Sequence, residues 1–300
     1  MIVLTGCTGF VGGHLVAALA GSTRTGSKAL RCLVRDPSRA AHLAESGVEL
    51  VRGDVTDPAS VADAIDGSTE AVIHLVGILA EPRGSSFSKI HVEGTRNVVE
   101  ACLAKGVTRY LHISALGTRE GARSEYHRTK WEAEEIIRAS GLSYTIFRPS
   151  VIFGPEDKFT NVFARVLRRV PVVVIPGSGK NLFQPVYVDD VAGAIAGSLD
   201  MDETAGRVFE LGGPRAFTFD ETMDEIARAL GRRAPLKIHV PMALMRVGAA
   251  LAEAALPVPP ITRDQLLMIE EDNVTDSAAL EEVFGITPTA FADGMRTYLH

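Results

Sequence analysis

The sequence predicts an α/β protein in which a doubly wound parallel sheet is followed by a smaller mixed α/β lobe. Short apolar stretches alternate with amphipathic ones from the first residues onward, which is typical of strands joined by crossover helices. The alternation loosens after residue 155. We therefore expect a sheet domain over residues 1–155, and a lobe over residues 156–300 that is interleaved with the end of the sheet.

The composition is that of an ordinary globular protein. Of the 300 residues, 46% are hydrophobic and 23% are charged. The net charge of −6 gives no reason to expect a nucleic-acid partner, and no run of Lys or Arg suggests an anionic membrane surface. Cys7, Cys32 and Cys102 are far apart in the sequence, so we expect buried thiols in a reducing compartment and no metal site.

No leader precedes the first strand, so a chain that starts at Met1 is expected to stay in the cytoplasm. The longest apolar stretch, Val240 to Leu256, is interrupted by Pro241, Arg246 and Glu253 and is too short to span a bilayer. We expect a helix that packs on the body of the protein. The alternative is peripheral contact with a membrane through its Leu, Met and Val side chains.

A strand, a glycine-rich turn and a helix open the chain. Ile2 to Leu4 is an apolar run, Gly6, Gly9 and Gly12 follow with the spacing GxxGxxG, and His14 to Ala20 has the character of a helix. In this setting glycines permit a tight turn, close approach to a pyrophosphate and close packing of helix on strand, while the helix N-terminus binds phosphate. The alternative is a glycine-rich turn that binds no ligand.

The second predicted strand, Leu30 to Val34, ends at the place where a cofactor ribose would lie. Arg35 follows it, and Arg39 comes one turn later. An arginine near this strand end is typical of sites that accept a 2′-phosphate, so we expect NADP(H). Asp36 could instead accept a hydrogen bond from a ribose hydroxyl, which would allow NAD(H).

A third strand over Val48 to Val51 leads into Asp54 and Val55. Asp54 could bind the adenine amine with Val55 against the ring. Alternatively, Asp54 is the N-cap of a helix that starts after Pro58.

The next two strands continue the pattern. Ala71 to Val76 is apolar except for His74, which we expect to be a core histidine, and Gly77 would let a cofactor pass close to the backbone. Ser88 to Lys105 is amphipathic and predicts a helix, and Arg109 to Ser114 predicts the fifth strand. Ligands of such sheets lie beyond the carboxyl ends of the strands.

Tyr126 and Lys130 are four residues apart within Ser124 to Ser140, which has helical periodicity, so they share one face of a helix. A tyrosine can exchange a proton with a carbonyl or carbinol oxygen if its pKa of about 10 falls toward neutrality. A neighbouring ammonium lowers that pKa. Ser114, at the end of the fifth strand, could bind the same substrate oxygen.

The rest of the chain predicts shorter elements. We expect a sixth strand over Leu142 to Arg148, and then helices and extended segments in alternation. The helices are expected over Asn161 to Arg169, Val191 to Leu199 and Phe219 to Leu230, and the extended segments over Phe183 to Val188 and Arg207 to Leu211.

Taken together, these residues resemble the short-chain dehydrogenase/reductase superfamily in its extended and atypical branches. The resemblance is greatest to the group of the mitochondrial complex I alpha-subcomplex subunit nine, which includes stand-alone bacterial NAD(P)-binding proteins. It runs through nearly the whole chain. The stretches that carry it are TGCTGFVGGHL from Thr5, LVRDPSRA from Leu33, HVEGTRNVVEAC from His91, RPSVIFGPEDKFTN from Arg148, FQPVYVDDVA from Phe183, FELGGP from Phe209 and TRDQLLMIEEDNV from Thr262.

The resemblance implies a Rossmann fold and a set of site residues. The catalytic triad would be Ser114, Tyr126 as acid/base, and Lys130, which also holds the nicotinamide ribose. Many extended members carry asparagine where His91 stands, so their proton relay through water is in doubt here. The residues implied to line the cofactor are Gly6, Thr8, Gly9, Phe10, Val11, Gly12, Arg35, Asp54, Val55, Val76, Gly77, Lys130, Pro149 and Val151.

Three functions are compatible with this resemblance. The first is an NADP(H)-dependent oxidoreductase that acts on a small-molecule carbonyl, alcohol or quinone-like substrate. The second is a non-catalytic or weakly catalytic NADPH-binding protein associated with respiratory complex I or quinone metabolism. The third is a nucleotide-sugar epimerase or dehydratase that holds NAD. In many relatives the helix that bears Tyr126 forms a homodimer surface.

Overall fold

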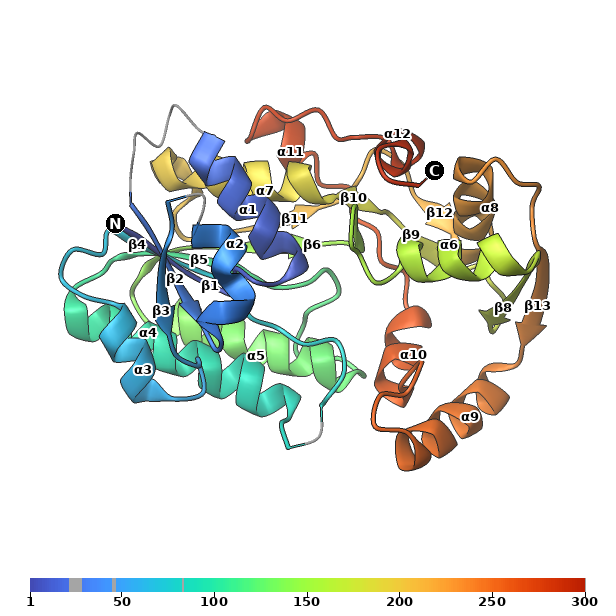
Figure 1. Cartoon of the computed structure of the whole chain (residues 1–300), viewed down its shortest axis with the longest axis horizontal. Coiled ribbons are helices and arrows are strands. Elements are labelled where there is room, and N and C mark those ends of the chain that lie inside the picture. Colours follow the sequence, from blue (N-terminus) through green and yellow to red (C-terminus); the bar gives the residue numbers. More distant parts are fainter. Residues whose placement is uncertain (22–28, 45–46, 83, 300) are drawn as a thin grey trace. The chain divides into compact units, whose positions relative to one another are not determined.

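The chain divides into two compact units in the computed structural model (Figure 1), which describes residues 1–21, 29–44, 47–82 and 84–299. Unit 1 comprises Met1–Arg148 and Val191–Phe209, and unit 2 comprises Pro149–Asp190 and Glu210–His300. The first unit therefore ends seven residues before the predicted position 155 and regains a helix and most of a strand later in the chain.

Unit 1 is built on a seven-stranded parallel sheet, which confirms the predicted doubly wound fold. The strand order is β11-β6-β5-β4-β1-β2-β3, so the chain reverses direction across the sheet between β1 and β4. Ligands of such sheets bind at this switch point, beyond the carboxyl ends of the strands. The strands are β1 (Ile2–Thr5), β2 (Leu30–Val34), β3 (Glu49–Arg52), β4 (Ala71–His74), β5 (Arg109–Ile113), β6 (Ser143–Pro149) and β11 (Arg207–Leu211).

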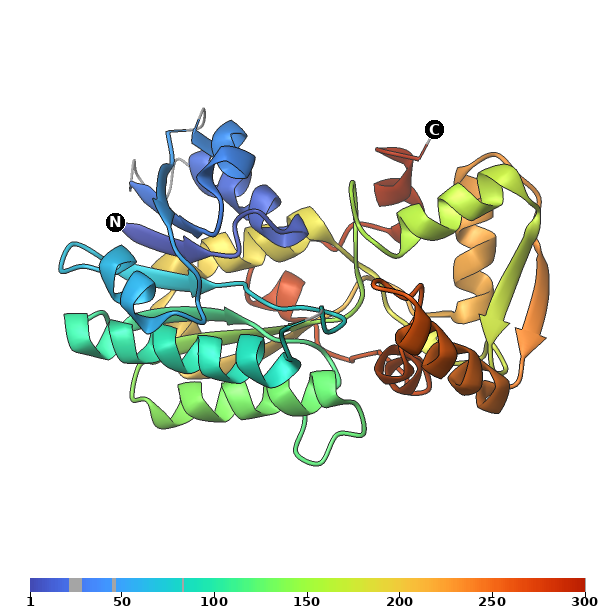
Figure 2. The ribbon, with the colours of Figure 1, turned by 60° about the horizontal axis from the view of Figure 1, so that its bottom comes forward.

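Helices cover both faces of this sheet (Figures 1 and 2). One face carries α1 (Phe10–Gly21) and α7 (Val188–Gly197), and the other carries α3 (Pro58–Ala64), α4 (Gly94–Lys105) and α5 (Glu125–Ala139). The short segments η1 (Pro37–Ala40) and α2 (Ala41–Ala44) follow β2, and η3 (Ser198–Asp200) and η4 (Asp202–Thr204) follow α7. The core beneath α3, α4 and α5 is aliphatic, and its members include Val3, Val72, Val98, Cys102, Ile137 and Ile146.

Two helices differ from the prediction. The first helix begins at Phe10 rather than His14, so Gly12 and Gly13 lie within its first turn despite their weak helix propensity. The expected helix over Ser88 to Lys105 is a π-helical segment, η2 (Ser88–Glu93), continued by α4. A π-helical turn inside a helix often marks a functional site.

Unit 2 is held together by aromatic side chains rather than by one large sheet. Its strands form three pairs: β7 (Ile152–Phe153) with β10 (Val186–Tyr187), β9 (Leu182–Phe183) with β12 (Phe217–Thr218), and β8 (Val172–Pro176) with β13 (Leu236–Val240). Phe153, Phe183, Phe217, Phe219 and Phe291 are buried together in its core. Its helices are α6 (Thr160–Arg169), α8 (Phe219–Ala229), α9 (Met242–Ala255), α10 (Arg263–Ile269), α11 (Ala279–Glu282) and α12 (Phe291–Arg296).

The apolar stretch from Val240 to Leu256 forms the end of β13 and the whole of α9. Within the described ranges, no helix combines the length and the apolar character that crossing a bilayer requires.

Candidate active site

The glycine-rich turn has the geometry of a pyrophosphate cradle. Gly6 has a φ of +80°, and a side-chain carbon there would lie 3.0 Å from the backbone after β4. A side-chain carbon at Gly12 would lie 2.3 Å from the carbonyl oxygen of Gly6, so α1 can pack this closely on the turn only without a side chain. At Gly9 the one such neighbour among the described residues is the Gly6 oxygen at 3.2 Å, so the described part of the chain leaves the remaining space around it open. The turn therefore fits a diphosphate.

The N-terminus of α1 adds an electrostatic attraction for phosphate. Its first turn contains no acidic residue that would neutralise the positive end of the helix dipole. Thr8 and Gly9 are exposed just before this turn, and Phe10 and Val11 are half-buried within it. These four residues, which the resemblance implies as cofactor contacts, therefore lie at the positive end of this helix, and their contact with a cofactor stays a prediction.

The carboxyl end of β2 presents an arginine rather than a carboxylate. Arg35 is exposed, and among the described residues it forms no ion pair. The Asp36 carboxylate accepts hydrogen bonds from the Ser38 backbone N–H (3.1 Å) and hydroxyl (2.6 Å), and so caps η1. Bonding to Ser38 lowers the pKa of Asp36. Asp36 Oδ1 is thus engaged within η1, while the Arg35 side chain lies exposed at the strand end.

Asp54 and Val55, the predicted adenine contacts, are held by the protein itself. Asp54 Oδ1 accepts hydrogen bonds from the backbone and hydroxyl of Thr56, both at 2.9 Å. The alternative that Asp54 caps the next helix is wrong, because the N-cap of α3 is Asp57. The Val55 side chain is buried in the core against Gly94 of α4, and its contact with an adenine stays a prediction.

Lys130 is buried near the carboxyl ends of β4 and β5. Its ammonium donates a hydrogen bond to the carbonyl oxygen of Ile113 at 3.0 Å. A side-chain carbon at Gly77 would lie 3.0 Å from Lys130 Nζ, so the loop after β4 passes directly beside this ammonium. Burial lowers the pKa of Lys130 to about 8, although the carboxylate of Glu134 opposes this shift.

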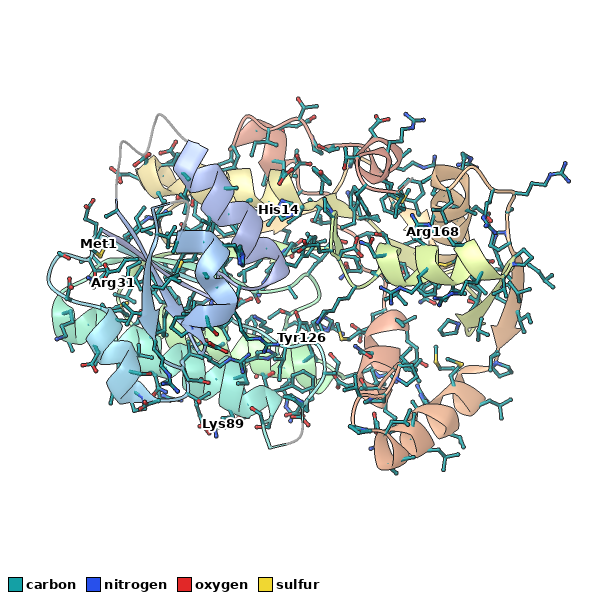
Figure 3. All side chains as sticks on the ribbon, in the orientation of Figure 1. Met1, His14, Arg31, Lys89, Tyr126 and Arg168 are labelled. Atoms are coloured by element: carbon teal, nitrogen blue, oxygen red, sulfur yellow. The ribbon has the colours of Figure 1, made fainter. Side chains whose placement is uncertain are left out.

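Tyr126, labelled in Figure 3, lies in the first turn of α5. It comes one helical turn before Lys130. Its ring is buried edge-on against those of Phe87 and His91, with centroids 6.0 and 5.5 Å away. Burial raises the pKa of Tyr126 above its usual value. This is opposite to the depression that the spacing to Lys130 predicts, because loss of hydration disfavours the phenolate in the protein alone.

Ser114 contributes to a buried ionic cluster. Its hydroxyl donates to Glu134 Oε1 at 2.5 Å, and Glu134 is fully buried on α5. Arg148 donates to both oxygens of Glu134, at 2.9 and 2.7 Å, and Arg138 donates to Oε2 at 2.5 Å. Ser114 thus lies directly after β5 with its hydroxyl proton directed to Glu134, and its role in polarising a substrate oxygen stays a prediction. Sequence reasoning missed Glu134, since a glutamate on an amphipathic helix ordinarily faces solvent.

His91 joins the site where the resemblance leads one to expect asparagine. The backbone N–H of Ile78 donates to His91 Nε2 at 3.1 Å, so in the neutral ring the proton is on Nδ1 and is donated to Thr129 Oγ1, 2.9 Å away. Burial and nearby Lys130 lower the pKa of His91 to about 2, which keeps the ring neutral. His91 therefore ties the loop after β4 to the first turn of α5, which carries Tyr126.

Two further histidines lie beneath this site on neighbouring strands. His74 and His112 are paired across β4 and β5 with ring centroids 5.4 Å apart, and both are fully buried. His74 Nδ1 hydrogen-bonds Thr5 Oγ1 at 2.6 Å. In the part of the chain that the structure describes, no partner is found for His74 Nε2, for either nitrogen of His112, or for the Tyr110 hydroxyl. His74 is thus a core histidine, as predicted, but only half of its hydrogen-bonding capacity is satisfied.

The remaining predicted cofactor residues belong to different parts of the fold. Val76 packs against the aliphatic core of unit 1. Pro149 and Val151 belong to unit 2, where the backbone N–H of Val151 donates to Asn273 Oδ1 at 3.1 Å.

The Rossmann sheet, the glycine-rich cradle and the adjacent Tyr126 and Lys130 define a nicotinamide-dinucleotide-binding protein of the dehydrogenase/reductase class. The chain belongs to the NAD dependent epimerase/dehydratase family, whose model matches residues 2–212.

Known relatives span two kinds of protein. The chain is 32% identical over 280 residues to the mitochondrial NADH dehydrogenase [ubiquinone] 1 alpha subcomplex subunit 9 of Dictyostelium discoideum, covering 92% of this chain and 77% of that protein. It is 30% identical over 256 residues to the ceramide reductase of Caulobacter vibrioides, covering 85% and 78%. Among solved structures, it resembles the NADPH-dependent quinone oxidoreductase QOR2 of Escherichia coli in complex with NADPH, with a TM-score of 0.80, 21% identity and full coverage of both chains.

Proposed function

We propose that this protein is an NADP(H)-dependent oxidoreductase that interconverts a carbonyl and a carbinol, or reduces a quinone-like carbonyl, on a small molecule. The observation that carries the proposal is the packing of Lys130 against the loop after β4. Its ammonium would lie 3.0 Å from a side-chain carbon at position 77, so it packs directly against this loop, one turn of α5 away from Tyr126. A buried phenol and a buried ammonium at the carboxyl edge of a dinucleotide-binding sheet form an acid/base pair beside the cofactor site.

When bound, the cofactor supplies the hydride to the carbonyl carbon in the direction of reduction, and accepts it in the direction of oxidation. The Tyr126 phenol donates its proton to the carbonyl oxygen as the carbinol forms, and takes it back in the reverse direction. Lys130 stabilises the phenolate that remains, because an ammonium in a buried site acts through a low effective dielectric. His91 is a positioning residue, since its two hydrogen bonds hold the cofactor loop to the turn that carries Tyr126.

The cradle of Gly6, Gly9 and Gly12 would hold the pyrophosphate, and Lys130 would hold the nicotinamide ribose. Arg35 supports NADP(H) over NAD(H), because an exposed guanidinium without an ion pair among the described residues is available to a 2′-phosphate. Replacing Arg35 with Asp should shift the ratio of NADPH to NADH affinity toward NADH by at least about tenfold, measured by fluorescence titration. The matched variant Arg96→Asp, on exposed α4 surface, should leave the ratio unchanged.

The test of catalysis is Tyr126→Phe, assayed for NADPH oxidation against a panel of carbonyls and quinones. Turnover should fall by about 10² to 10⁴-fold while NADPH affinity is retained. The control is Tyr144→Phe, which removes a phenol from β6 in the same unit. Equal turnover in Tyr126→Phe and the native chain would show that Tyr126 is not the acid/base.

A second candidate is an NADPH-binding protein without turnover, in which the cofactor stabilises the fold. Two observations favour it: a relative is named as a subunit of NADH dehydrogenase, and burial raises rather than lowers the pKa of Tyr126. Tight NADPH binding with no oxidation by any member of the panel would establish this alternative. Turnover of a UDP-sugar with co-purified NAD would instead establish the epimerase or dehydratase reading that the family description allows.

A further inference from the structure

Strand β13 of unit 2 carries its polar side chains on the face toward α8 and exposes aliphatic side chains on the other face. Lys237 and His239 point toward α8, where Lys237 donates to Asp224 at 2.7 Å and His239 contacts Asp220 at 3.0 Å. Leu236 and Ile238, on the opposite face, are 64% and 46% exposed. The aliphatic Leu236 and Ile238 are more exposed than Lys237 and His239, whose side chains are 18% and 40% exposed, which indicates that something apolar covers the open face.

The neighbouring strand has the same open face. β8 pairs with β13 in parallel register, with Val172 opposite Leu236 and Val174 opposite Ile238. Val173 and Ile175 point to the other side, into the core of unit 2, while Val174 is 51% exposed. The open face of this two-stranded sheet is therefore aliphatic throughout.

Helix α9 begins two residues after β13 and adds a second exposed stripe. Leu244, Val247 and Leu251 follow at helical spacing and are all more than half exposed, whereas Ala249 is the residue of α9 that is buried. Such a helix contributes few side chains to the core of unit 2, so its apolar face can contact a lipid bilayer or another partner.

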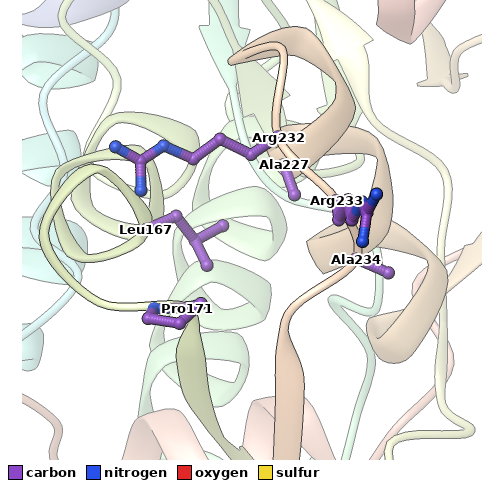
Figure 4. A pocket seen from close by; sticks show the side chains of 6 residues that line it. All are labelled: Leu167, Pro171, Ala227, Arg232, Arg233 and Ala234. Carbon is purple, nitrogen blue, oxygen red and sulfur yellow. The ribbon is translucent and has the colours of Figure 1, made fainter.

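Arginines border the sheet at the edge where both strands begin. Because β8 and β13 are parallel, Arg168 and Arg169 before β8 come close to Arg232 and Arg233 before β13. Arg232 donates a hydrogen bond to the backbone oxygen of Arg168 at 2.8 Å. Figure 4 shows Arg232 reaching from the loop before β13 toward the end of α6, at a pocket of about 250 Å³ that Leu167 and Pro171 also line.

The charge of these segments is opposite to that of the chain. Residues 158–188 and 226–255, which contain α6, β8, β13 and α9, carry ten Lys and Arg and one Glu. Since the net charge of the chain is −6 and these segments carry +9, the remaining residues together carry −15. Arg228, Lys237 and Arg246 pair with carboxylates of neighbouring segments, so the positive charge of the surface is concentrated at the arginines of the strand edge. An apolar surface bordered by arginines on an acidic protein is complementary to an anionic lipid bilayer, and less so to a second copy of the same surface, whose arginines would repel it.

We propose that the docking surface, defined as the open face of β8 and β13, the exposed stripe of α9 and the four arginines at the strand edge, binds anionic membranes peripherally. The aliphatic side chains enter the boundary between headgroups and acyl chains, and the arginines bind lipid phosphates. The inference is independent of the proposed reaction, because it would hold equally for a protein without turnover.

The test is flotation of the full chain with vesicles of phosphatidylcholine alone, or of equal parts of phosphatidylcholine and phosphatidylglycerol. We expect binding to the phosphatidylglycerol vesicles that weakens as salt rises from about 0.05 to 0.5 M, because salt screens the attraction between arginine and headgroup. Replacing the four arginines with Gln should reduce partitioning at least about tenfold. Leu236→Ser with Ile238→Ser should also weaken it, and so should the triple change of Leu244, Val247 and Leu251 to Ser.

Two matched controls isolate the surface from net charge and hydrophobicity. Replacing Arg96, Arg119, Arg128 and Arg296 with Gln removes the same charge from exposed positions elsewhere, and Leu103→Ser removes an exposed leucine from α4. Both should float like the native chain, and NADPH affinity confirms that every variant is folded.

Three results would overturn the proposal: no flotation with either vesicle, equal losses in the control variants, or serine variants that bind vesicles normally but change a dimer into a monomer by sedimentation velocity. The last result would assign the surface to contact between copies. None of these outcomes bears on turnover, so failure here and failure of the proposed function are distinguishable.

Discussion

The two units depart in opposite directions from the usual pattern, in which polar side chains are exposed and apolar side chains are buried. Unit 1 buries polar groups at the carboxyl edge of its sheet, including Lys130, Glu134 and three histidines. Unit 2 leaves aliphatic side chains of β8, β13 and α9 exposed. An exposed leucine or a buried lysine is unfavourable taken alone, so each departure from ordinary patterning indicates where a ligand or a surface completes the protein.

The two departures differ in energetic consequence. A buried polar group affects the free energy of folding directly, because burial removes water and the protein must replace its hydrogen bonds. An exposed aliphatic group changes the folded chain little, since it is hydrated in both the folded and the unfolded states. Substitutions in unit 1 should therefore alter stability and its pH dependence, whereas those on the docking surface of unit 2 should alter binding alone.

Low pH should destabilise the protein most strongly, through the buried histidines. Burial, with the charge of Lys130 adding to it, lowers the pKa of His74 to about 3 and that of His91 to about 2, and lowers that of His112 as well. The unfolded chain therefore binds more protons below a pH of about 6.5, and stability falls by up to about 4 kcal/mol per pH unit for the three rings together. Urea unfolding at pH 7, 6 and 5 measures this slope. A flat profile would show that the rings are hydrated or already charged.

Glu134→Gln should destabilise the protein by about 3 to 5 kcal/mol, because it leaves Arg138 and Arg148 without their shared buried carboxylate. Urea unfolding monitored by circular dichroism measures the difference in unfolding free energy between this variant and the native chain. The matched control is Glu135→Gln, on the exposed side of α5, where the ion pair with Arg138 is expected to contribute less than about 1 kcal/mol. Equal losses of unfolding free energy in the two variants would show that burial of the cluster does not increase its contribution to stability.

Lys130→Met should change how stability varies at high pH. Burial lowers the pKa of Lys130 from 10.5 to about 8, so the native state releases this proton before the unfolded state does. Stability of the native chain should therefore rise, relative to the variant, by about 3 kcal/mol between pH 8 and pH 10.5. The measurement is the difference in unfolding free energy between the two proteins across that range. A difference that stays constant with pH would place the ammonium in water.

The double variant Leu236→Ser and Ile238→Ser should change the unfolding free energy by less than about 1 kcal/mol, since both side chains are already exposed. Ile73→Ser, in the buried strand β4, is the contrasting variant and should cost several kcal/mol. A large loss in the exposed pair would show that the open face is covered within the chain, and would remove the basis for a membrane partner.

The sequence predicted a helix or strand correctly where the residues of that segment alone determine its conformation. β2 and β11 occupy the predicted residues, and α5 spans Glu125–Ala139 within the predicted Ser124 to Ser140. β8 and β13 were missed, because their pairing joins segments 64 residues apart and β13 has its apolar face outward. The pKa of Tyr126 was predicted in the wrong direction, because the spacing to Lys130 carries no information about how deeply the phenol is buried.

The sequence alone determined that a strand, a three-glycine turn and a helix open the chain, and that Tyr126 and Lys130 share one face of a helix. These follow from local rules of backbone conformation and helical period. Only the tertiary structure decided three further contacts. The Ser114 hydroxyl donates to Glu134, His91 accepts a hydrogen bond from the loop after β4, and two pairs of arginines that are distant in the sequence lie at one sheet edge. Each of these depends on groups 13 to 64 residues apart, whose proximity is set by the packing of the whole fold rather than by any local pattern.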